Sequence, residues 1–198
     1  MKRRGTGWTI LGLLLIAAAF FLTFYNIRED NRAKDSSEAV AEQLRQCLPS
    51  DLPEETKVPE YLIYPEMEMP VQEVDGLSYV GMLTIPALGV ELPVCDEWSY
   101  PNLRIAPCRY TGSAYTNNLI LCAHNYSTHF GTIKSLHAGD QVLFTDMDGH
   151  VFTYEVAVLE TLQPTDIEEM ESGDWDLTLF TCTLGGQSRI TVRCINIL

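Results

Sequence analysis

Residues 176–189, DLTLFTCTLGGQSR, place a cysteine at the end of a short strand-like run and an arginine after the turn that follows. The run 177–182 predicts a strand, and the glycines after Cys182 predict a turn that leaves the thiol open to a substrate. Arg189 begins the next predicted strand, so the turn can return it beside the thiol. A cation there lowers the pKa of a cysteine from about 8.5 and can donate hydrogen bonds to a developing oxyanion.

Short apolar runs of the same kind fill the chain from residue 76 onward. The predicted strands are 79–85, 90–94, 119–123, 141–145, 151–162, 177–182 and 189–198. Asp148-Gly149 lies between two of them and is a hairpin signal. Only 132–136 and 166–171 are typical of single helical turns. Many short strands with little helix predict a mainly β domain, either a barrel or a sandwich.

A histidine ends another predicted strand, in the run LILCAHN that covers residues 119–125. The imidazole of His124 can shuttle a proton, because its ordinary pKa lies near about 6.5. His129, His137 and His150 are candidates for the same role, so position alone does not choose among the four. A zinc site made of three of these histidines is a minor alternative, because no close cysteine pair accompanies them.

The six cysteines, at positions 47, 95, 108, 122, 182 and 194, include no C-x-x-C pair. This spacing argues against a zinc ribbon and against a thioredoxin-type redox pair. Cys108, Cys122 and Cys194 lie among apolar residues, and we expect them to be small buried hydrophobic side chains.

The composition limits the choice of partners. The 198 residues hold 13 basic and 27 acidic side chains, a net charge of −14, and 46% of the residues are apolar. Lys2, Arg3 and Arg4 are the only charged residues before position 28, which leaves −17 for residues 28–198. The apolar share argues against disorder, and so acidic a surface repels phosphate backbones. We therefore expect one folded domain with appendages and no nucleic-acid partner.

Twenty uncharged residues, WTILGLLLIAAAFFLTFYNI, run from Trp8 to Ile27. As a helix they span about 30 Å, the thickness of the hydrocarbon core of a bilayer. A cleaved signal peptide is the alternative, but the small residues 17–19 lie in the middle of the run rather than after it. The preceding cations predict that the N-terminus is cytoplasmic and that the bulk of the chain is outside.

The segment after the apolar run holds 13 acidic residues, five basic residues and five prolines. Val40, Leu44 and Leu48 recur every four residues, which predicts a helix that Pro49 ends. The prolines that follow, up to Pro70, predict an extended spacer. Because the apolar stripe is short, we expect a solvated stalk. The expected organisation is a cytoplasmic end at 1–7, a transmembrane helix at 8–27, an acidic stalk at 28–75 and a folded domain at 76–198.

Several of these segments, in this order, resemble the motifs of sortases, the membrane-anchored cysteine transpeptidases of Gram-positive bacteria. Thr178, Leu179, Thr181 and Cys182 match the sortase signature T-L-x-T-C position by position. The other matching segments are LTIP at 83–86, LPV at 92–94, LCAHN at 121–125, Phe130 with Leu136 and GDQV at 139–142, and the arginine pair of 189–193. The resemblance covers residues 79–194, essentially the whole predicted domain.

The resemblance implies an eight-stranded sortase-type β-barrel with short helical turns and an active site of three residues. Cys182 would attack the threonine carbonyl of an LPxTG-like sorting signal and form a thioacyl enzyme. His124 would protonate the leaving amine, and Arg189 would hold the substrate and the oxyanion. An amine would then resolve the thioacyl enzyme.

The resemblance also implies substrate contacts around these residues. Thr181, Thr183 and Asn125 are the expected substrate-binding neighbours. Segment 163–176 takes the place of the loop that cradles the sorting signal, and its acidic residues predict a preference for basic or amine-bearing partners that salt weakens.

The implied partners are secreted proteins that carry a sorting signal, and an amine acceptor on a peptidoglycan precursor or a pilin. The implied location is the cell membrane, crossed once, with the catalytic domain on the extracellular side. No second apolar run of spanning length occurs, unlike in many pilin-polymerising sortases. We expect no metal or other cofactor. The calcium site of one sortase class uses scattered acidic residues that cannot be matched in this sequence, so calcium activation stays open.

Three alternatives compete with this interpretation. An L,D-transpeptidase also uses cysteine, histidine and arginine, but its motif S-x-G-C-x-R requires an arginine where this chain has Leu184. Another extracellular Cys/His peptidase, or an anchored binding module that lost its activity, stays open, although the three intact residues disfavour the binding module. Arg193 is an alternative to Arg189, because it shares the strand parity about 13 Å further along.

Overall fold

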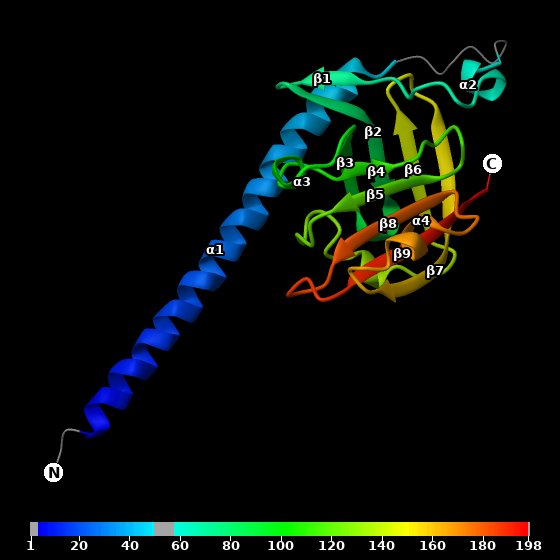
Figure 1. Ribbon diagram of the computed structural model, residues 1–198. Helices are drawn as coiled ribbons and strands as arrows, with labels where there is room; N and C mark the ends of the chain where they lie inside the picture. Colours follow the sequence, from blue (N-terminus) through cyan, green and yellow to red (C-terminus); the bar gives the residue numbers. More distant parts are fainter. Residues whose placement is uncertain (1–3, 50–57, 198) are drawn as a thin grey trace. The chain divides into compact units, whose positions relative to one another are not determined.

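The computed structural model describes residues 4–49 and 58–197, in two compact units that divide after Arg32 (Figure 1). The first unit is the N-terminal part of α1 (Arg4–Cys47). The predicted helix over residues 8–27 is confirmed, and its most apolar 18-residue window has a mean hydropathy of 2.2 and no buried residue. By length and composition, such a helix can cross a membrane. The second unit, from Ala33, holds the remainder of α1 and all the strands described.

Eight strands of the second unit form a closed barrel, as expected for the mainly β domain. Around the barrel they follow the order β2-β3-β4-β5-β8-β9-β7-β6, and β6 pairs with β2 to close it; β1 extends β2 at one edge. The strands are β1 (Gln72–Val74), β2 (Leu77–Ile85), β3 (Val90–Cys95), β4 (Cys108–Thr111), β5 (Leu119–Ala123), β6 (Gln141–Asp146), β7 (Val151–Leu162), β8 (Leu177–Cys182) and β9 (Arg189–Asn196). The short helices are α2 (Glu60–Ile63), η1 (Pro86–Leu88), α3 (Tyr100–Leu103), η2 (Ile133–Ser135) and α4 (Ile167–Glu171).

Alternation along the strands builds the core inside the barrel. In β8, Leu177 and Leu179 are fully buried in the main apolar cluster, together with Val192 of β9 and Leu121 of β5. Neighbouring residues on a strand point to opposite faces, so Phe180 and Cys182 face outward. The register of the barrel therefore decides which side chains of β8 can meet a substrate.

Closure of the barrel needs a residue without a side chain at the seam. Gly81 of β2 pairs with Asp146 of β6, and a Cβ at position 81 would lie 2.2 Å from the carbonyl oxygen of Thr145. Any larger residue would push β2 and β6 apart at this point.

The C-terminal part of α1 packs on the outside of the barrel, so the expectation of a solvated stalk is wrong there. Val40, Ala41 and Leu44 are buried in a second apolar cluster with Tyr79 and Met82 of β2. The helix ends at Cys47, just before Pro49, as predicted. The narrow apolar stripe is sufficient to attach the helix to the barrel, because the outer face of β2 and β3 is itself apolar.

The chain before β1 also lies on the barrel and is not the extended spacer expected from its prolines. Tyr61 of α2 stacks on Tyr115, with ring centroids 4.6 Å apart, and meets His150 edge-on at 5.0 Å. Below it, Asp146 accepts hydrogen bonds from the Tyr115 hydroxyl (2.7 Å) and from Nδ1 of His150 (2.9 Å). The part of the predicted spacer at residues 50–57 lies outside the described residues.

The seven predicted strands are all present, three of them with the predicted bounds. The sequence did not predict β1 and β4, which are only three and four residues long and too short to show a period. Predicted turns at 132–136 and 166–171 coincide with η2 and α4. Residue 198 of the last predicted strand lies outside the described part of the chain.

Candidate functional site

Three neighbouring strands bring the predicted site residues to one end of the barrel. Cys182 is the last residue of β8 and is the direct cross-strand partner of Arg189, the first residue of β9. On the other side, β5 runs parallel to β8 with Ala123 opposite Thr181, so continuing the register by one residue places His124 opposite Cys182. Adjacent strands lie about 4.8 Å apart. His124 and Arg189 therefore start from the strand positions on either side of Cys182, on the same outward face.

The thiol of Cys182 is half-buried and borders a cavity of about 330 Å³. Three predicted substrate-binding residues, Thr181, Thr183 and Asn125, line this cavity, and so does Lys134. The hydroxyl of Thr181 donates to the carbonyl oxygen of Ala123 at 2.8 Å and is buried, so it ties β8 to β5. His124 does not line the cavity, but its neighbour Asn125 does.

His124 is half-buried, and its ring meets that of Tyr126 edge-on at 5.2 Å. Burial lowers the pKa of His124 below its usual value near 6.5, and the positive charge of Arg104 lowers it further. The free imidazole is therefore mainly neutral at neutral pH, the form that can accept a proton. Arg104 was not found from the sequence, because a single exposed cation beside a four-residue helix carries no recognisable signal.

The loop between β8 and β9 is tight and holds Arg189 in place. Thr183 donates its backbone N–H to the Ser188 carbonyl oxygen at 2.9 Å, and Gly185 and Gly186 have positive φ angles of 84° and 72°. Nη1 of Arg189 donates to the carbonyl oxygens of Gly186 (3.2 Å) and Ser188 (3.3 Å). These two bonds use only one of the three guanidinium nitrogens, so the others can serve a substrate oxygen.

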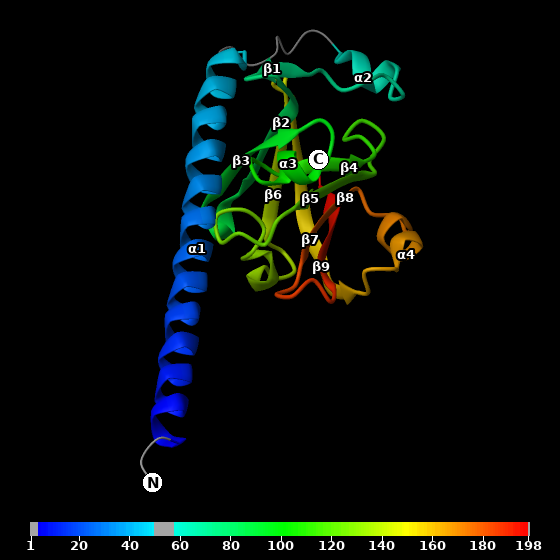
Figure 2. The same cartoon turned by 60° about the vertical axis from the view of Figure 1, so that its left-hand side comes forward.

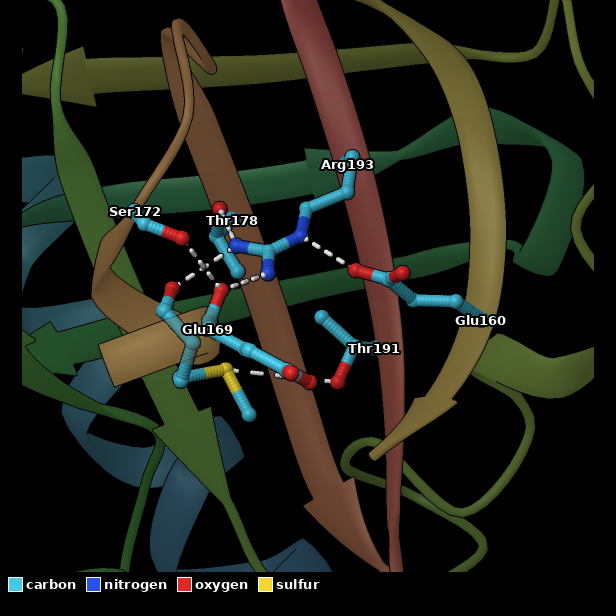
Figure 3. Close-up of polar contacts among 7 residues, drawn as sticks. Glu160, Glu169, Ser172, Thr178, Thr191 and Arg193 are labelled. Carbon is cyan, nitrogen blue, oxygen red and sulfur yellow. Dashed lines mark hydrogen bonds and ion pairs between the residues drawn. The ribbon is translucent and has the colours of Figure 1, made fainter. Parts of the chain in front are cut away.

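Arg193 has a different task from Arg189, although the two share a face of β9. Its guanidinium is buried beneath α4 and donates to the carbonyl oxygens of Glu169 (2.6 Å) and Met170 (2.7 Å), as Figure 3 shows. It also pairs with Glu160 at 2.7 Å and donates to the Thr178 hydroxyl at 3.0 Å. Figure 1 and Figure 2 both place α4 outside the barrel beside β8 and β9. Arg193 thus anchors the loop that precedes β8, and the structure does not favour it as an alternative to Arg189.

The other histidines lie in separate surroundings. His129 is fully buried beside Tyr126, with ring centroids 5.4 Å apart, and His137 is exposed near Asp140. His150 pairs with Asp146, and Asp146 also accepts a hydrogen bond from Tyr115. The sequence did not suggest this group of three residues, because Tyr115 is remote from the other two in the chain. Within residues 4–49 and 58–197, no group of three or more histidine, cysteine or acidic side chains is arranged to hold a metal ion.

Comparison with known proteins gives one consistent result. A family model described as "Sortase domain" matches residues 83–196. Sortase A of Bacillus anthracis is 29% identical over 115 residues, which cover 55% of this chain and 54% of that protein. The chain therefore spans about half the length of this curated relative.

Solved structures show the same fold. Sortase C1 of Streptococcus suis is 25% identical with a TM-score of 0.53, covering 61% of this chain and 73% of that one. Sortase D5 of Clostridium perfringens, described as a transpeptidase, is 20% identical with a TM-score of 0.59, covering 85% and 99%. Sortase E of Streptomyces avermitilis is 25% identical with a TM-score of 0.53, covering 61% and 88%.

Proposed function

The chain belongs to the sortase family, and from this premise we propose that it cleaves an LPxTG-like sorting signal and transfers the released protein to an amine. Cys182 is the nucleophile, His124 the proton donor and acceptor, and Arg189 the stabiliser of the oxyanion. The observation that carries this proposal is the register of three strands. In this register the half-buried Cys182 has Arg189 as its cross-strand partner on one side and the position of His124 on the other, which supports the proposed roles.

The first half-reaction forms a thioester. His124, neutral in the free protein, takes the proton of the Cys182 thiol, and the thiolate attacks the threonine carbonyl carbon. Negative charge develops on the carbonyl oxygen, where the unused N–H groups of Arg189 can donate to it. The C–N bond then breaks, and His124 returns its proton to the leaving amine.

The second half-reaction consumes the thioester. An acceptor amine gives a proton to His124 and attacks the thioester carbonyl, an amide bond forms, and the C–S bond breaks to restore Cys182. The acceptor is an amine of a peptidoglycan precursor or a pilin lysine. In the absence of an acceptor, water can take its place, and the reaction becomes hydrolysis.

We place the sorting signal over the outer face of β8, leading to Cys182. Phe180 lies there and meets the ring of Tyr110 edge-on, with centroids 5.4 Å apart. Segment 163–176, which includes α4, borders this face and carries the acidic residues that favour basic groups on the donor. Thr183 and Asn125 are further substrate contacts in this proposal.

The N-terminal helix fits a membrane-anchored sortase. We propose that it crosses the membrane once, with residues 1–7 in the cytoplasm and the barrel on the extracellular side, where secreted substrates and cell-wall amines are found. The organisation proposed from the sequence, with its domain at 76–198, needs one extension, because the compact unit already includes residues from Ala33.

The first test is turnover of sorting-signal peptides by the full chain in detergent micelles. A library of LPxTG-like peptides is incubated with a diglycine acceptor, and the products are identified by mass spectrometry. Cys182→Ala should reduce both cleavage and transfer by at least about 10³-fold, since no other nucleophile is positioned to form the thioester.

Cys47→Ala is the matched control, because Cys47 is exposed but lies on α1 away from the three strand ends. Undiminished turnover by Cys182→Ala would remove Cys182 from the mechanism. If the unmodified chain cleaves no peptide and no thioacyl enzyme is trapped, the chain is an anchored binding module and the proposal fails.

A further inference from the structure

The described basic residues of the barrel unit, in 33–49 and 58–197, divide into two groups. Lys34, Arg45, Arg109 and Arg193 each contact a carboxylate, respectively Glu38, Glu42 with Glu91, Asp96, and Glu160. Arg104, Lys134 and Arg189 form no ion pair with any residue of 33–49 or 58–197. These three are the basic residues that the candidate site brings together.

The three cations lie near the reacting groups. Arg189 is the cross-strand partner of Cys182, and Lys134 lines the cavity that the thiol borders. Arg104 lies close enough to His124 for its charge to act on the imidazole. Positive charge is therefore present on the cross-strand partner of the thiol, on the lining of the cavity and near the imidazole.

The cavity itself carries no negative charge. Its nine lining residues include Lys134 and no aspartate or glutamate, although the chain has 27 acidic residues. Its volume of about 330 Å³ is enough for a group the size of an amino acid. No residue of the acidic loop 163–176 lines the cavity, although the loop starts directly after Leu162, the cross-strand partner of Arg189.

This charge distribution discriminates among amine acceptors. A simple alkylamine is a cation at neutral pH and is repelled by three uncompensated positive charges. An acceptor that also carries a carboxylate has no net charge, and its carboxylate can pair with the ammonium of Lys134. The amine is then left to face the thioester.

Resting on the proposed function, we propose that the cavity beside Cys182 is the acceptor subsite, and that Lys134 makes it selective for amines that carry a free carboxylate. The acceptor class is an amino acid or a short peptide with a free carboxylate near its amine, rather than an isolated lysine side chain of a protein. The carboxylate is not consumed. It holds the acceptor while the amine nitrogen bonds to the thioester carbon, the C–S bond breaks, and the amine proton passes to His124.

A test that needs no substrate compares two alkylating reagents on the full chain in detergent. Iodoacetate is an anion and iodoacetamide is neutral, and both alkylate thiols. The ratio of their rates at Cys182 is measured by mass spectrometry and divided by the same ratio at Cys47, which is exposed, whereas the described cysteines other than these two are buried. We expect the normalised ratio to favour iodoacetate by about threefold to tenfold, as for an ion pair that solvent only partly screens.

Two variants assign this effect to Lys134. Lys134→Gln should remove most of the preference for the anion, whereas Lys34→Gln should keep it, because Lys34 is paired with Glu38 and lies on α1. High salt should weaken the preference in the unmodified chain. A normalised ratio near one in the unmodified chain, or an unchanged ratio in Lys134→Gln, would overturn the subsite.

A second test uses transfer itself and separates the subsite from the proposed function. Glycylglycine and glycylglycine amide are compared as acceptors for the same thioacyl enzyme. We expect kcat/KM to be about threefold to tenfold higher for the free acid, and Lys134→Gln to lose that ratio while Lys34→Gln keeps it. Equal use of both acceptors by an active enzyme refutes the subsite alone. No cleavage of any peptide, together with an alkylation preference for the anion, refutes the proposed function alone.

Discussion

At the scale of single residues, the environment of each thiol separates Cys182 from the other cysteines. Cys95, Cys108, Cys122 and Cys194 are buried, and burial raises the pKa of Cys122 and Cys194 to about 12. The raised pKa keeps the thiols of Cys122 and Cys194 protonated at neutral pH, and the burial of Cys108, Cys122 and Cys194 agrees with the expectation from the sequence. Cys182 is half-buried and flanked by His124 and Arg189. Reactivity follows from this placement, since all six side chains are chemically identical.

Arg189→Lys tests whether the geometry of the cation matters at this position. Lysine keeps the charge but replaces a planar fork with a single point, and it cannot hold Gly186 and Ser188 while donating to an oxyanion. We expect kcat/KM for a sorting-signal peptide to fall by about 10²-fold or more. Lys34→Arg is the control for the charge swap. Near-normal turnover of Arg189→Lys would reopen Arg193 as the catalytic arginine.

Arg104→Gln tests the electrostatic control of His124. Burial and the Arg104 charge both lower the pKa of His124, so removing the charge should raise this pKa while burial still holds it down. In the proposed mechanism the neutral imidazole is the active form, so the acid limb of the kcat/KM profile should move to higher pH. A titration of the His124 ring by NMR should show the same shift.

The control for this shift is Lys34→Gln, which removes a charge that the pKa of His124 does not respond to. A limb that stays in place, or that moves to lower pH, would show that Arg104 does not set the protonation of His124.

At the scale of elements, one buried side chain holds α4 against the barrel. α4 is only five residues long, too short to be stable alone, and Arg193 binds two of its last carbonyl oxygens. A cation at a helix C-terminus is favourable because the unpaired carbonyl oxygens there carry partial negative charge. In the proposed function, the position of α4 defines one border of the donor site.

Arg193→Met should release α4 and lower the free energy of unfolding by about 2–4 kcal/mol, because buried carbonyl oxygens and the hydroxyl of Thr178 lose their donor. We expect KM for the sorting-signal peptide to rise more than kcat falls, since Cys182 and His124 stay in place. Chemical denaturation and steady-state kinetics measure the two effects.

Glu160→Gln is the matched variant, because Glu160 is the ion-pair partner of Arg193. The Glu160 side chain is 36% exposed, so its charge is partly solvated, and its loss should cost less than about 1 kcal/mol. If Arg193→Met leaves KM unchanged while it lowers stability, Arg193 supports the fold and has no effect on donor binding.

At the scale of the whole molecule, the compact unit begins at Ala33 and includes more than the barrel. The end of α1 covers apolar residues of β2 and β3, and the segment around Tyr61 covers Tyr115 and Phe152. Both additions remove from water apolar surface that a domain starting at residue 76 would expose. The compact unit is therefore longer than the stretch of residues 83–196 that the family model matches.

A fragment of residues 33–198 should melt at a higher temperature than a fragment of residues 76–198, because only the longer one buries the Leu44 side chain. Leu44→Ala in the longer fragment should lower the free energy of unfolding by about 2–5 kcal/mol. The side chain of Gln43 is exposed, so Gln43→Ala should change the free energy of unfolding little. Equal melting temperatures for the two fragments would show that α1 does not stabilise the barrel.

The sequence by itself determined the features that rest on local order. The run 177–182 specified a strand that ends in a cysteine, the four-residue spacing specified the helix that Pro49 ends, and seven apolar runs specified the strands of a β domain. Each of these depends on periodicity or on a turn residue within about ten positions, and such signals are contained in the chain itself. The ordered motifs within residues 79–194 also indicated the family, because they depend on the sequence and on no tertiary contact.

Only the tertiary structure decided what those strands bring together. The placement of His124 opposite Cys182 follows from a parallel pairing of β5 with β8, residues that are 58 positions apart in the chain. The lining of the cavity at Lys134, which holds no carboxylate among the described residues, is likewise a result of packing, as are the contacts of Arg193 under α4 and the burial of Leu44. Side chains distant in sequence meet only when the barrel closes, and the free energy of each contact depends on neighbours that no local pattern identifies.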